Sequence, residues 1–223
     1  MKEIILDTET TGLSVKEGHR IVEIGCIEIE NQIPTQNKFH YYLNPERNVS
    51  KDALKVHGYT DEFLSDKKKF NQIVDEFLFF IKGKKLVMHN AEFDLAYLNN
   101  ELKIARREIL DRKNVIDTLE IARDKFPGSS ISLDALCKRY RIDNSRRNKH
   151  TALIDCELLT KVYINLLDQK EPSLNFSQTL NNDMEKKIKK IESYYKKIIK
   201  PSSAEIEEHK KFLKNNLKKN YFN

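Results

Sequence analysis

Residues 4–13, IILDTETTGL, contain the feature that most limits how this chain can fold. The β-branched, apolar beginning predicts a buried strand, yet Asp7 and Glu9 fall within the same stretch. Side chains two positions apart on a strand project from one face, and two carboxylates on a buried face are costly unless a positive charge compensates them. The stretch therefore predicts a strand that presents a cation site.

Further carboxylates should converge on that site, because hard cations such as Mg²⁺ take oxygen ligands and rarely sit in an all-protein cage. Two segments supply them: Asp94 in HNAEFD opens a predicted helix, and Asp155 follows His150 by five residues in HTALID. Each is weak evidence alone, since an Asp in a first helical turn usually serves the helix dipole and a lone His is usually structural.

The first part of the chain predicts three consecutive antiparallel strands, within residues 3–9, 19–31 and 37–45. Helical spacing of apolar residues then predicts a helix over 69–82, followed by a strand within 84–90. Beyond it we expect a helix over 91–102, a strand at 114–116, and helices over 118–126, 132–140 and 151–167. Asp117 is well placed to cap the helix over 118–126. Together these elements predict an α/β fold, a mixed sheet covered by helices.

The composition, 39% hydrophobic and 33% charged over 223 residues, is that of a soluble protein. No stretch approaches the roughly 20 apolar residues that span a bilayer, and MKEIILDTET resembles no secretory signal. We therefore expect a cytoplasmic protein without membrane contact. Cys26, Cys137 and Cys156 form no C-x-x-C pair, so we expect buried, reduced thiols; Cys156 as a nucleophile beside Asp155 is the alternative.

The net charge of +6 belongs mainly to the C-terminal part: residues 1–167 carry +1 and residues 168–223 carry +5. We predict a domain over 1–167, because the helical pattern stops there and a polar, Pro-containing segment follows. Residues 168–200 combine this linker with a Lys-rich amphipathic helix predicted over 184–200. A solvated face is the simpler interpretation of its lysines, and incidental DNA contact is the alternative. Residues 201–223 begin with Ser202 and Glu205 in a capping box, which predicts a further helix with Ile206, Leu213 and Leu217 near one face.

The three acidic segments together form a known pattern. D-x-E at Asp7–Glu9, N-x-x-F-D at Asn90–Asp94 and H-x-x-x-x-D at His150–Asp155 occur in the order found in the DEDDh 3′-5′ exonucleases. The stretches DTETTGL, HRIVEIG, VHGYTDEFL, FPGSSISLDALCKRY and IDNSRRNKHTALIDCELL extend the resemblance over residues 3–167, and they are similar to the proofreading exonucleases of bacterial replicative polymerases.

The resemblance implies an RNase H-like fold, a five-stranded mixed sheet whose first three strands are antiparallel. It implies that Asp7, Glu9, Asp94 and Asp155 hold two divalent ions, Mg²⁺ or Mn²⁺, with Asp7 shared between them, and that His150 is the general base. Two ions about 3.5–4 Å apart serve both the attacking and the departing oxygen of a phosphodiester, and an imidazole with an ordinary pKa near 6.5 is free to accept a proton at neutral pH.

The resemblance also assigns substrate contacts. Thr8, Thr10, Gly12 and Leu13 match the loop around the terminal nucleotide, and Val56, His57, Asn90 and Phe93 match the pocket for its base and sugar. For Leu13, Val56 and Phe93 plain packing is an equal alternative, because apolar residues usually serve the core. We expect His57 on an exposed polar loop, and we expect His89 to be a satisfied core histidine rather than a support of the site.

The expected substrate is a frayed 3′ end of DNA, since a nearly neutral domain cannot grip a duplex through many phosphates and a mismatched end costs less to unpair. A domain that binds DNA weakly by itself would need partner proteins to bring it to the DNA. Residues 171–176, EPSLNF, resemble the family's sliding-clamp motif, with Leu174 and Phe176 as anchors, although Glu171 stands where Gln is expected. Residues 202–214 resemble the segment that docks on the polymerase catalytic subunit, and a small accessory subunit is a further possible partner.

Three functions fit this pattern. The first is a metal-dependent 3′-5′ exodeoxyribonuclease that proofreads within a replicase. The second is a free-standing DEDDh exonuclease that trims 3′ ends of RNA or single-stranded DNA, which would share every catalytic residue and differ in partners. The third is a structural adaptor between polymerase and clamp, which the complete set of five catalytic positions argues against.

Overall fold

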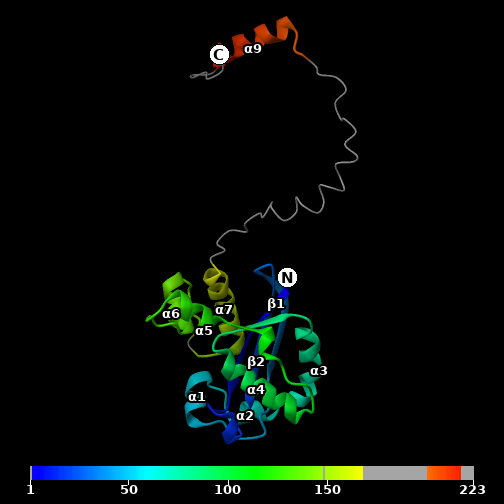
Figure 1. The fold of residues 1–223 in the computed structure, drawn as a ribbon, viewed down its shortest axis with the longest axis vertical. Helices are drawn as coiled ribbons and strands as arrows, with labels where there is room; N and C mark the ends of the chain where they lie inside the picture. Colours follow the sequence, from blue (N-terminus) through cyan, green and yellow to red (C-terminus); the bar gives the residue numbers. More distant parts are fainter. Residues whose placement is uncertain (1, 148, 168–199, 217–223) are drawn as a thin grey trace. The chain divides into compact units, whose positions relative to one another are not determined.

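A computed structural model describes residues 2–147, 149–167 and 200–216 of the chain. The chain divides into two compact units, residues 1–172 and 173–223. The first unit holds a five-stranded sheet with the order β3-β2-β1-β4-β5 (Figure 1). Its strands are β1 (Lys2–Thr10), β2 (Ile21–Glu30), β3 (Ile33–Tyr42), β4 (Lys85–Met88) and β5 (Val115–Asp117).

The first three strands form an antiparallel meander, and β4 and β5 join β1 in parallel. This mixed sheet confirms the fold predicted from the alternating and β-branched patterns. The helices of the unit are α1 (Lys51–His57), α2 (Asp61–Ser65), α3 (Phe70–Ile81), α4 (Ala91–Ile104), α5 (Thr118–Lys125), α6 (Leu133–Tyr140) and α7 (Ala152–Leu166), with single 3-10 turns at Val15–Glu17 and Arg112–Asn114.

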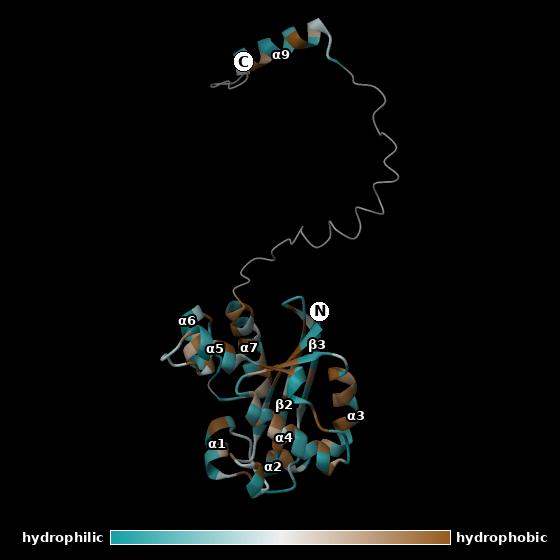
Figure 2. Cartoon of the chain, in the orientation of Figure 1, coloured by the Kyte–Doolittle hydropathy of each residue, from teal (hydrophilic) through white to brown (hydrophobic). Residues whose placement is uncertain are grey.

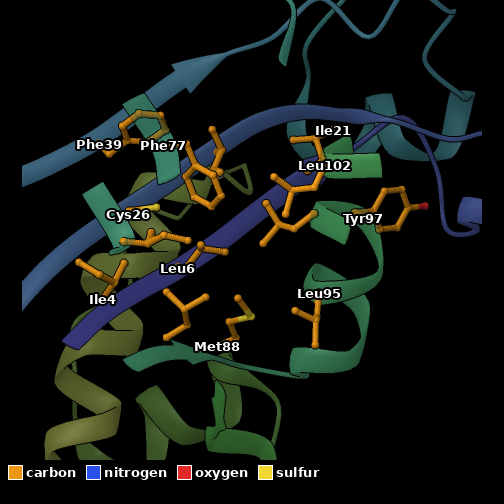
Figure 3. Packing of buried hydrophobic residues seen from close by; sticks show 14 of the residues in the cluster. Ile4, Leu6, Ile21, Cys26, Phe39, Phe77, Met88, Leu95, Tyr97 and Leu102 are labelled. Carbon is orange, nitrogen blue, oxygen red and sulfur yellow. The ribbon is translucent and has the colours of Figure 1, made fainter. Parts of the chain in front are cut away.

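Alternation along β1 divides its side chains between two cores, one on each face of the sheet. Ile4 and Leu6 pack with residues of α3 and α4 in the first core (Figure 3). Ile5 packs in the second core with residues of α5, α6 and α7. Because strand side chains alternate, Asp7 and Glu9 continue the α7 face and Thr8 continues the α4 face. The hydropathy colouring in Figure 2 shows the apolar residues of these strands in the interior of the unit.

Asp117 caps α5 as the sequence predicts: its side chain accepts a hydrogen bond from the backbone N–H of Leu119. The helices α1 and α2 were not predicted. Each is short, and each is capped by a hydroxyl, Ser50 for α1 and Thr60 for α2. The expectation that His57 lies on an exposed loop is wrong, because it is the last residue of α1 and only 3% exposed.

The three cysteines are buried and free, which confirms the packing interpretation. The Sγ of Cys156 contacts the backbone oxygens of Ile5 and Gly25, and burial raises the pKa of this thiol well above its ordinary value. A buried thiol that stays protonated is a poor nucleophile. Among the described residues, no helix is long and apolar enough to span a bilayer.

In the second unit the structure describes residues 200–216, which contain α9 (Ser203–Asn216). The predicted capping box is confirmed: the Glu205 carboxylate accepts from the backbone N–H and the hydroxyl of Ser202, and the Glu205 N–H donates to Ser202 Oγ. Ile206 and Phe212 are exposed, and apolar and polar residues alternate along the helix (Figure 2). The predicted helix at 184–200 and the clamp motif at 171–176 lie outside the described residues, apart from Lys200.

Candidate active site

The C-terminal end of β1 lines a cavity together with the two other acidic segments. Asp7, Thr8 and Glu9 come from β1, and Asp94 comes from α4. His150 lies in the loop before α7, and Asp155 lies in the first turn of α7. The structure therefore brings together five side chains from three segments spread over residues 7–155 of the chain.

Thr8 fixes Asp94 against β1. Its backbone N–H and its hydroxyl both donate to Asp94 Oδ1, at 3.0 and 2.7 Å. This accounts for the residue between the two carboxylates of β1: Thr8 faces α4, where a hydroxyl can reach the first helical turn. The contact joins positions 86 residues apart, and it leaves Asp94 buried, with 3% exposed.

The beginning of α4 is itself held by Asp117 at the end of β5. The carboxylate of Asp117 accepts from the backbone N–H groups of Asn90 and Ala91, at 3.0 Å each, in addition to capping α5. Asn90 has a φ of +71°, a conformation that Asn tolerates better than most residues. The N-x-x-F-D segment thus enters its helix through a sharp turn that is anchored on two strands.

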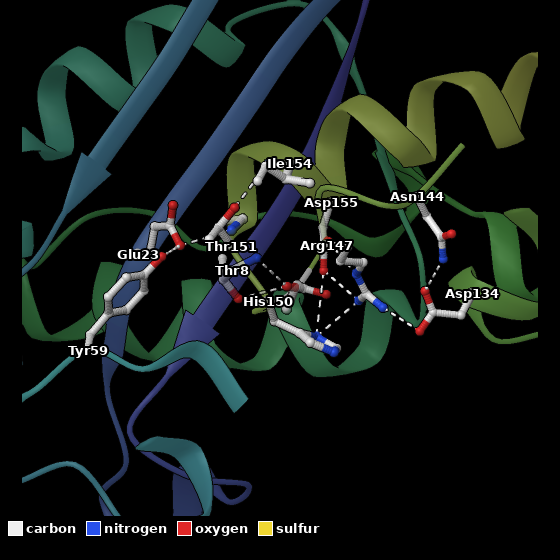
Figure 4. Close-up of polar contacts among 12 residues, drawn as sticks. Thr8, Glu23, Tyr59, Asp134, Asn144, Arg147, His150, Thr151, Ile154 and Asp155 are labelled. Carbon is white, nitrogen blue, oxygen red and sulfur yellow. Dashed lines mark hydrogen bonds and ion pairs between the residues drawn. The ribbon is translucent and has the colours of Figure 1, made fainter. Parts of the chain in front are cut away.

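Arg147 pairs with the carboxylate of Asp155 in two hydrogen bonds, Nε to Oδ1 at 2.6 Å and Nη2 to Oδ2 at 2.7 Å (Figure 4). Its third nitrogen, Nη1, contacts Asp134 Oδ2 at 2.7 Å. Nη2 also donates to His150 Nδ1 at 3.0 Å. Since a guanidinium only donates, this contact places the proton of a neutral His150 ring on Nε2.

The pKa values of the carboxyl groups show that the residues of the site do not compensate their negative charge. Burial raises the pKa of Asp7 well above its ordinary value, and the charges of Asp94 and Glu9 raise it further. Burial, followed by the charges of Asp155 and Glu23, raises the pKa of Glu9 to about 8. Burial raises the pKa of Asp94 to about 7, although its hydrogen bonds from Thr8 act in the opposite direction. A bound dication would stabilise the ionised form of these groups and so lower their pKa values.

The donor atoms fit such a cation. Glu9, His150 and Asp155 each offer a ligand atom, and these atoms lie within 4.8 Å of one another. Asp7 and Asp94 line the same cavity. A set made mainly of carboxylate oxygens suits a hard divalent ion that keeps water or substrate oxygens in its remaining positions. Burial, followed by the charge of Arg147, lowers the pKa of His150, which favours its neutral imidazole.

All eight residues predicted to contact substrate line the cavity: Thr8, Thr10, Gly12, Leu13, Val56, His57, Asn90 and Phe93. Leu13 is 86% exposed and Val56 is 43% exposed, so neither is a core residue. Phe93 packs against the core and against the ring of Tyr97, with 4.9 Å between the ring centroids, while also facing the cavity. The cavity occupies about 940 Å³.

Gly12 is required by close packing. A Cβ there would lie 2.4 Å from the His19 ring, and the Gly12 carbonyl accepts from Thr10 and Tyr97. His89 is half-buried, its Nδ1 lies 2.8 Å from Thr118 Oγ1, and it lines the cavity, so it is not a fully buried core residue.

Sequence reasoning missed Arg147, Asp134 and Glu23. The spacing of Arg147, three residues before His150, was a possible signal, but Arg146 beside it looks the same in sequence. The structure separates them, because the Arg147 side chain is 8% exposed and that of Arg146 is 75% exposed.

Comparison with known proteins decides the family. A protein-family model described as "Exonuclease" matches residues 4–163. The chain belongs to the exonuclease family. It is 45% identical over 227 residues to a DNA polymerase III subunit epsilon of Rickettsia conorii, covering 99% of each chain. It is also 43% identical to the protein of that name in Buchnera aphidicola, covering 95% of each.

Solved structures agree with this exonuclease fold. Exonuclease X in complex with 5′ overhanging duplex DNA has a TM-score of 0.58 and 26% identity, over 75% of this chain and 92% of that one. The nuclease domain of 3′hExo, described as a DEDDh family member bound to rAMP, has a TM-score of 0.66 over 76% and 92% of the chains; its 19% identity shows the fold alone. The predicted DEDDh, RNase H-like fold is therefore confirmed.

Proposed function

We propose that this chain is the proofreading subunit, epsilon, of a DNA polymerase III, and that it hydrolyses the 3′-terminal phosphodiester of DNA in the 3′-to-5′ direction. One observation carries the proposal: Asp7, Glu9, Asp94, His150 and Asp155 all line one cavity. Similarity over almost the whole length to proteins named DNA polymerase III subunit epsilon supports the replicase context.

The four carboxylates would hold two divalent ions, Mg²⁺ or Mn²⁺, with Asp7 shared between them. The bound ions would neutralise the phosphate and lower the pKa of the attacking water. His150 would accept the proton of that water, since its lowered pKa favours the neutral imidazole. Its Nε2 becomes the accepting atom only after Arg147 leaves Nδ1, because the neutral ring carries one proton.

The cavity suits a single unpaired terminal nucleotide. Leu13 and Val56 offer exposed apolar surface for a base and its neighbour, His57 and Asn90 offer polar atoms, and Phe93 offers a ring. With a net charge of +1 over residues 1–167, the domain has little sequence-independent grip on duplex phosphates. Selectivity for mismatches would then come from the ease with which the DNA end frays.

Partner proteins would supply the affinity for DNA that the domain lacks. We assign residues 1–167 to the exonuclease domain, 168–200 to a linker with a clamp-binding segment at Leu174 and Phe176, and 201–223 to a helix that docks on the polymerase catalytic subunit. The exposed Ile206 and Phe212 of α9 support this docking role, since a short isolated helix gains most of its stability from packing on a partner. We also propose a cytoplasmic location and leave a small accessory subunit as a further partner.

A mismatched primer assay tests the function. A 5′-labelled primer with a mismatched 3′ end, annealed to a template, should shorten one nucleotide at a time with Mg²⁺ or Mn²⁺ and stay intact with a chelator. His150→Ala and Asp155→Asn should lower the rate by about 100-fold or more. Glu157→Gln, on the same helix but paired with Lys38 and Arg146 at the surface, is the matched control.

Parallel RNA and single-stranded DNA substrates test the alternative of a free-standing trimming nuclease. Faster cleavage of RNA than of the mismatched primer would contradict the proofreading assignment. Metal-dependent cleavage retained in Asp155→Asn would contradict the site itself.

A further inference from the structure

Glu23 is a fully buried carboxyl group beside the active site, with 0% exposed. It lies on β2 directly opposite Glu9 in the β1–β2 register. Three donors approach it: His40 Nε2 at 2.7 Å from Oε1, Tyr59 Oη at 2.8 Å from Oε2, and the backbone N–H of Ala152 at 2.9 Å from Oε2. Burying a carboxyl group costs free energy of folding even when hydrogen bonds satisfy its oxygens. A carboxyl group kept in such a place is therefore a candidate for a functional role.

A single oxygen of Glu23 joins the two sides of the cavity. Oε2 accepts from Tyr59, which follows α1 (Figure 4). It also accepts from the backbone N–H of Ala152, the first residue of α7. Tyr59 in turn holds His57: the rings stack with their centroids 4.8 Å apart, and the Tyr59 N–H donates to His57 Nδ1 at 3.0 Å. Ala152 lies between His150 and Asp155 in sequence.

The two sides also touch directly. The His150 N–H donates to the Val56 carbonyl at 3.2 Å, and Lys149 Nζ donates to the Lys55 carbonyl at 2.8 Å. Val56, His57, His150 and Asp155 all line the cavity, whereas Glu23 and Tyr59 are not among its described lining residues. Glu23 therefore acts on the cavity through other groups.

Gly25 completes the arrangement. It pairs with Asp7 across the β1–β2 ladder, and a Cβ there would lie 2.7 Å from the backbone carbon of Ala152. Gly25 thus lets the backbone of α7 approach β2 closely. Glu23, two residues earlier and on the same face of the strand, accepts a hydrogen bond from the first residue of that helix. Both features set where α7 begins.

We propose that Glu23 is a positioning residue of the nuclease site, whose Oε2 fixes the separation between the His57 side and the His150–Asp155 side. The inference rests on the proposed function, because it assigns the two sides to the terminal nucleotide and to the chemical step. Misplacing such groups by about 1 Å can lower the rate by about 100-fold.

Tyr59→Phe removes one contact and keeps the ring. We expect the KM for a single-stranded oligonucleotide to rise roughly three- to tenfold, the value of one lost hydrogen bond, with kcat within about twofold of wild type. Glu23→Gln keeps the size of the side chain but turns an amide N–H₂ toward one donor, so we expect kcat to fall by about tenfold or more as well. In Glu23→Gln, adding Tyr59→Phe should raise KM no further.

Tyr41→Phe is the matched control. It removes a similar tyrosine–carboxylate hydrogen bond, Tyr41 Oη to Glu76 at 2.9 Å, an exposed contact between β3 and α3 whose residues do not line the cavity, and it should leave kcat and KM unchanged. Equal behaviour of Tyr59→Phe and Tyr41→Phe would overturn the inference, as would additive effects of Tyr59→Phe and Glu23→Gln. If Glu23→Gln fails to fold, the two tyrosine variants decide alone.

A binding measurement distinguishes a failure of this inference from a failure of the proposed function. In a chelator, where no cleavage occurs, the affinity for a fluorescent single-stranded oligonucleotide should fall in Tyr59→Phe and not in Tyr41→Phe. An inactive wild-type protein would refute the proposed function while this binding comparison still tests Glu23. An active wild-type protein whose Tyr59→Phe variant binds and cuts like the control would refute Glu23 alone.

Discussion

At the scale of single residues, the carboxyl groups of the site are held close together at a cost to the folded state without metal. Glu9 illustrates this, since burial and neighbouring negative charges raise its pKa to about 8 against an ordinary value near 4.5. Between these values the folded chain holds a proton that the unfolded chain has lost. The free energy of unfolding without metal therefore falls as the pH rises through this window.

Glu9→Gln isolates this effect. In a chelator, the variant should be more stable than wild type, and its advantage in melting temperature should grow from about pH 5 to pH 8 and then level off. The histidines of the site titrate in both proteins, so they cancel in the difference. A constant difference across this range would mean that Glu9 is not protonated in the folded state.

Arg147 provides the second residue-scale test. It occupies both oxygens of Asp155 and the Nδ1 of His150, so it competes with a metal ion for the same atoms. Arg147→Gln should destabilise the metal-free protein by roughly 3–5 kcal/mol, because it leaves a buried carboxylate unpaired. Mn²⁺ should then raise its melting temperature by more than that of wild type.

Arg146→Gln is the control for this variant, since the neighbouring side chain is largely exposed and bonds the surface residue Glu157. A smaller Mn²⁺ shift in Arg147→Gln than in Arg146→Gln would show that Arg147 assists metal binding instead of opposing it. Sequence could not distinguish the two arginines, because the difference lies in which side chain the loop turns inward.

At the scale of elements, the position of α7 against β2 depends on Gly25. Gly25→Ala should displace the beginning of α7, because the added Cβ meets backbone atoms of Ala152 and Leu153 at 2.7–2.9 Å. We expect a loss of about 1–3 kcal/mol in stability and at least a tenfold loss of nuclease activity well below the melting temperature. Thermal unfolding and primer cleavage measure these effects; unchanged activity at an unchanged melting temperature would contradict the packing.

The elements that sequence predicted are those with a strong apolar period. β1 and β2 are apolar on both faces, and α3 and α7 bury apolar residues at helical spacing, so their sequences indicate them directly. α1 and α2 have only 7 and 5 residues with few buried side chains, so no period is visible and only Ser50 and Thr60 mark them. Their omission led to the wrong placement of His57, which depends on the end of α1.

At the scale of the whole molecule, the site depends on distant segments that the sheet order brings to one place. Motif order in the sequence predicted which carboxylates meet. It could not predict the hydrogen bonds that fix them, such as Thr8 to Asp94 or Glu23 to Ala152, because these depend on which face of each element meets the other.

The division of the chain predicts separable functions. Removing residues 168–223 should abolish co-purification with the polymerase catalytic subunit and the sliding clamp, while hydrolysis of a short single-stranded oligonucleotide stays within about twofold of the full chain. Ile206→Asp in the full chain should weaken only the polymerase interaction, since it places a charge on the apolar side of α9. Partner binding that survives the truncation would contradict the assignment of this segment.

The central claim is that carboxylates from three distant segments bind divalent ions in one cavity. Titration of the full chain with Mn²⁺, with free ion counted by electron paramagnetic resonance, tests it directly. Wild type should bind two ions, and Asp94→Asn should lose or greatly weaken at least one, whereas Asp75→Asn, at the surface beside Arg107, should match wild type. Wild type that binds no Mn²⁺, or Asp94→Asn that titrates like Asp75→Asn, would contradict the account.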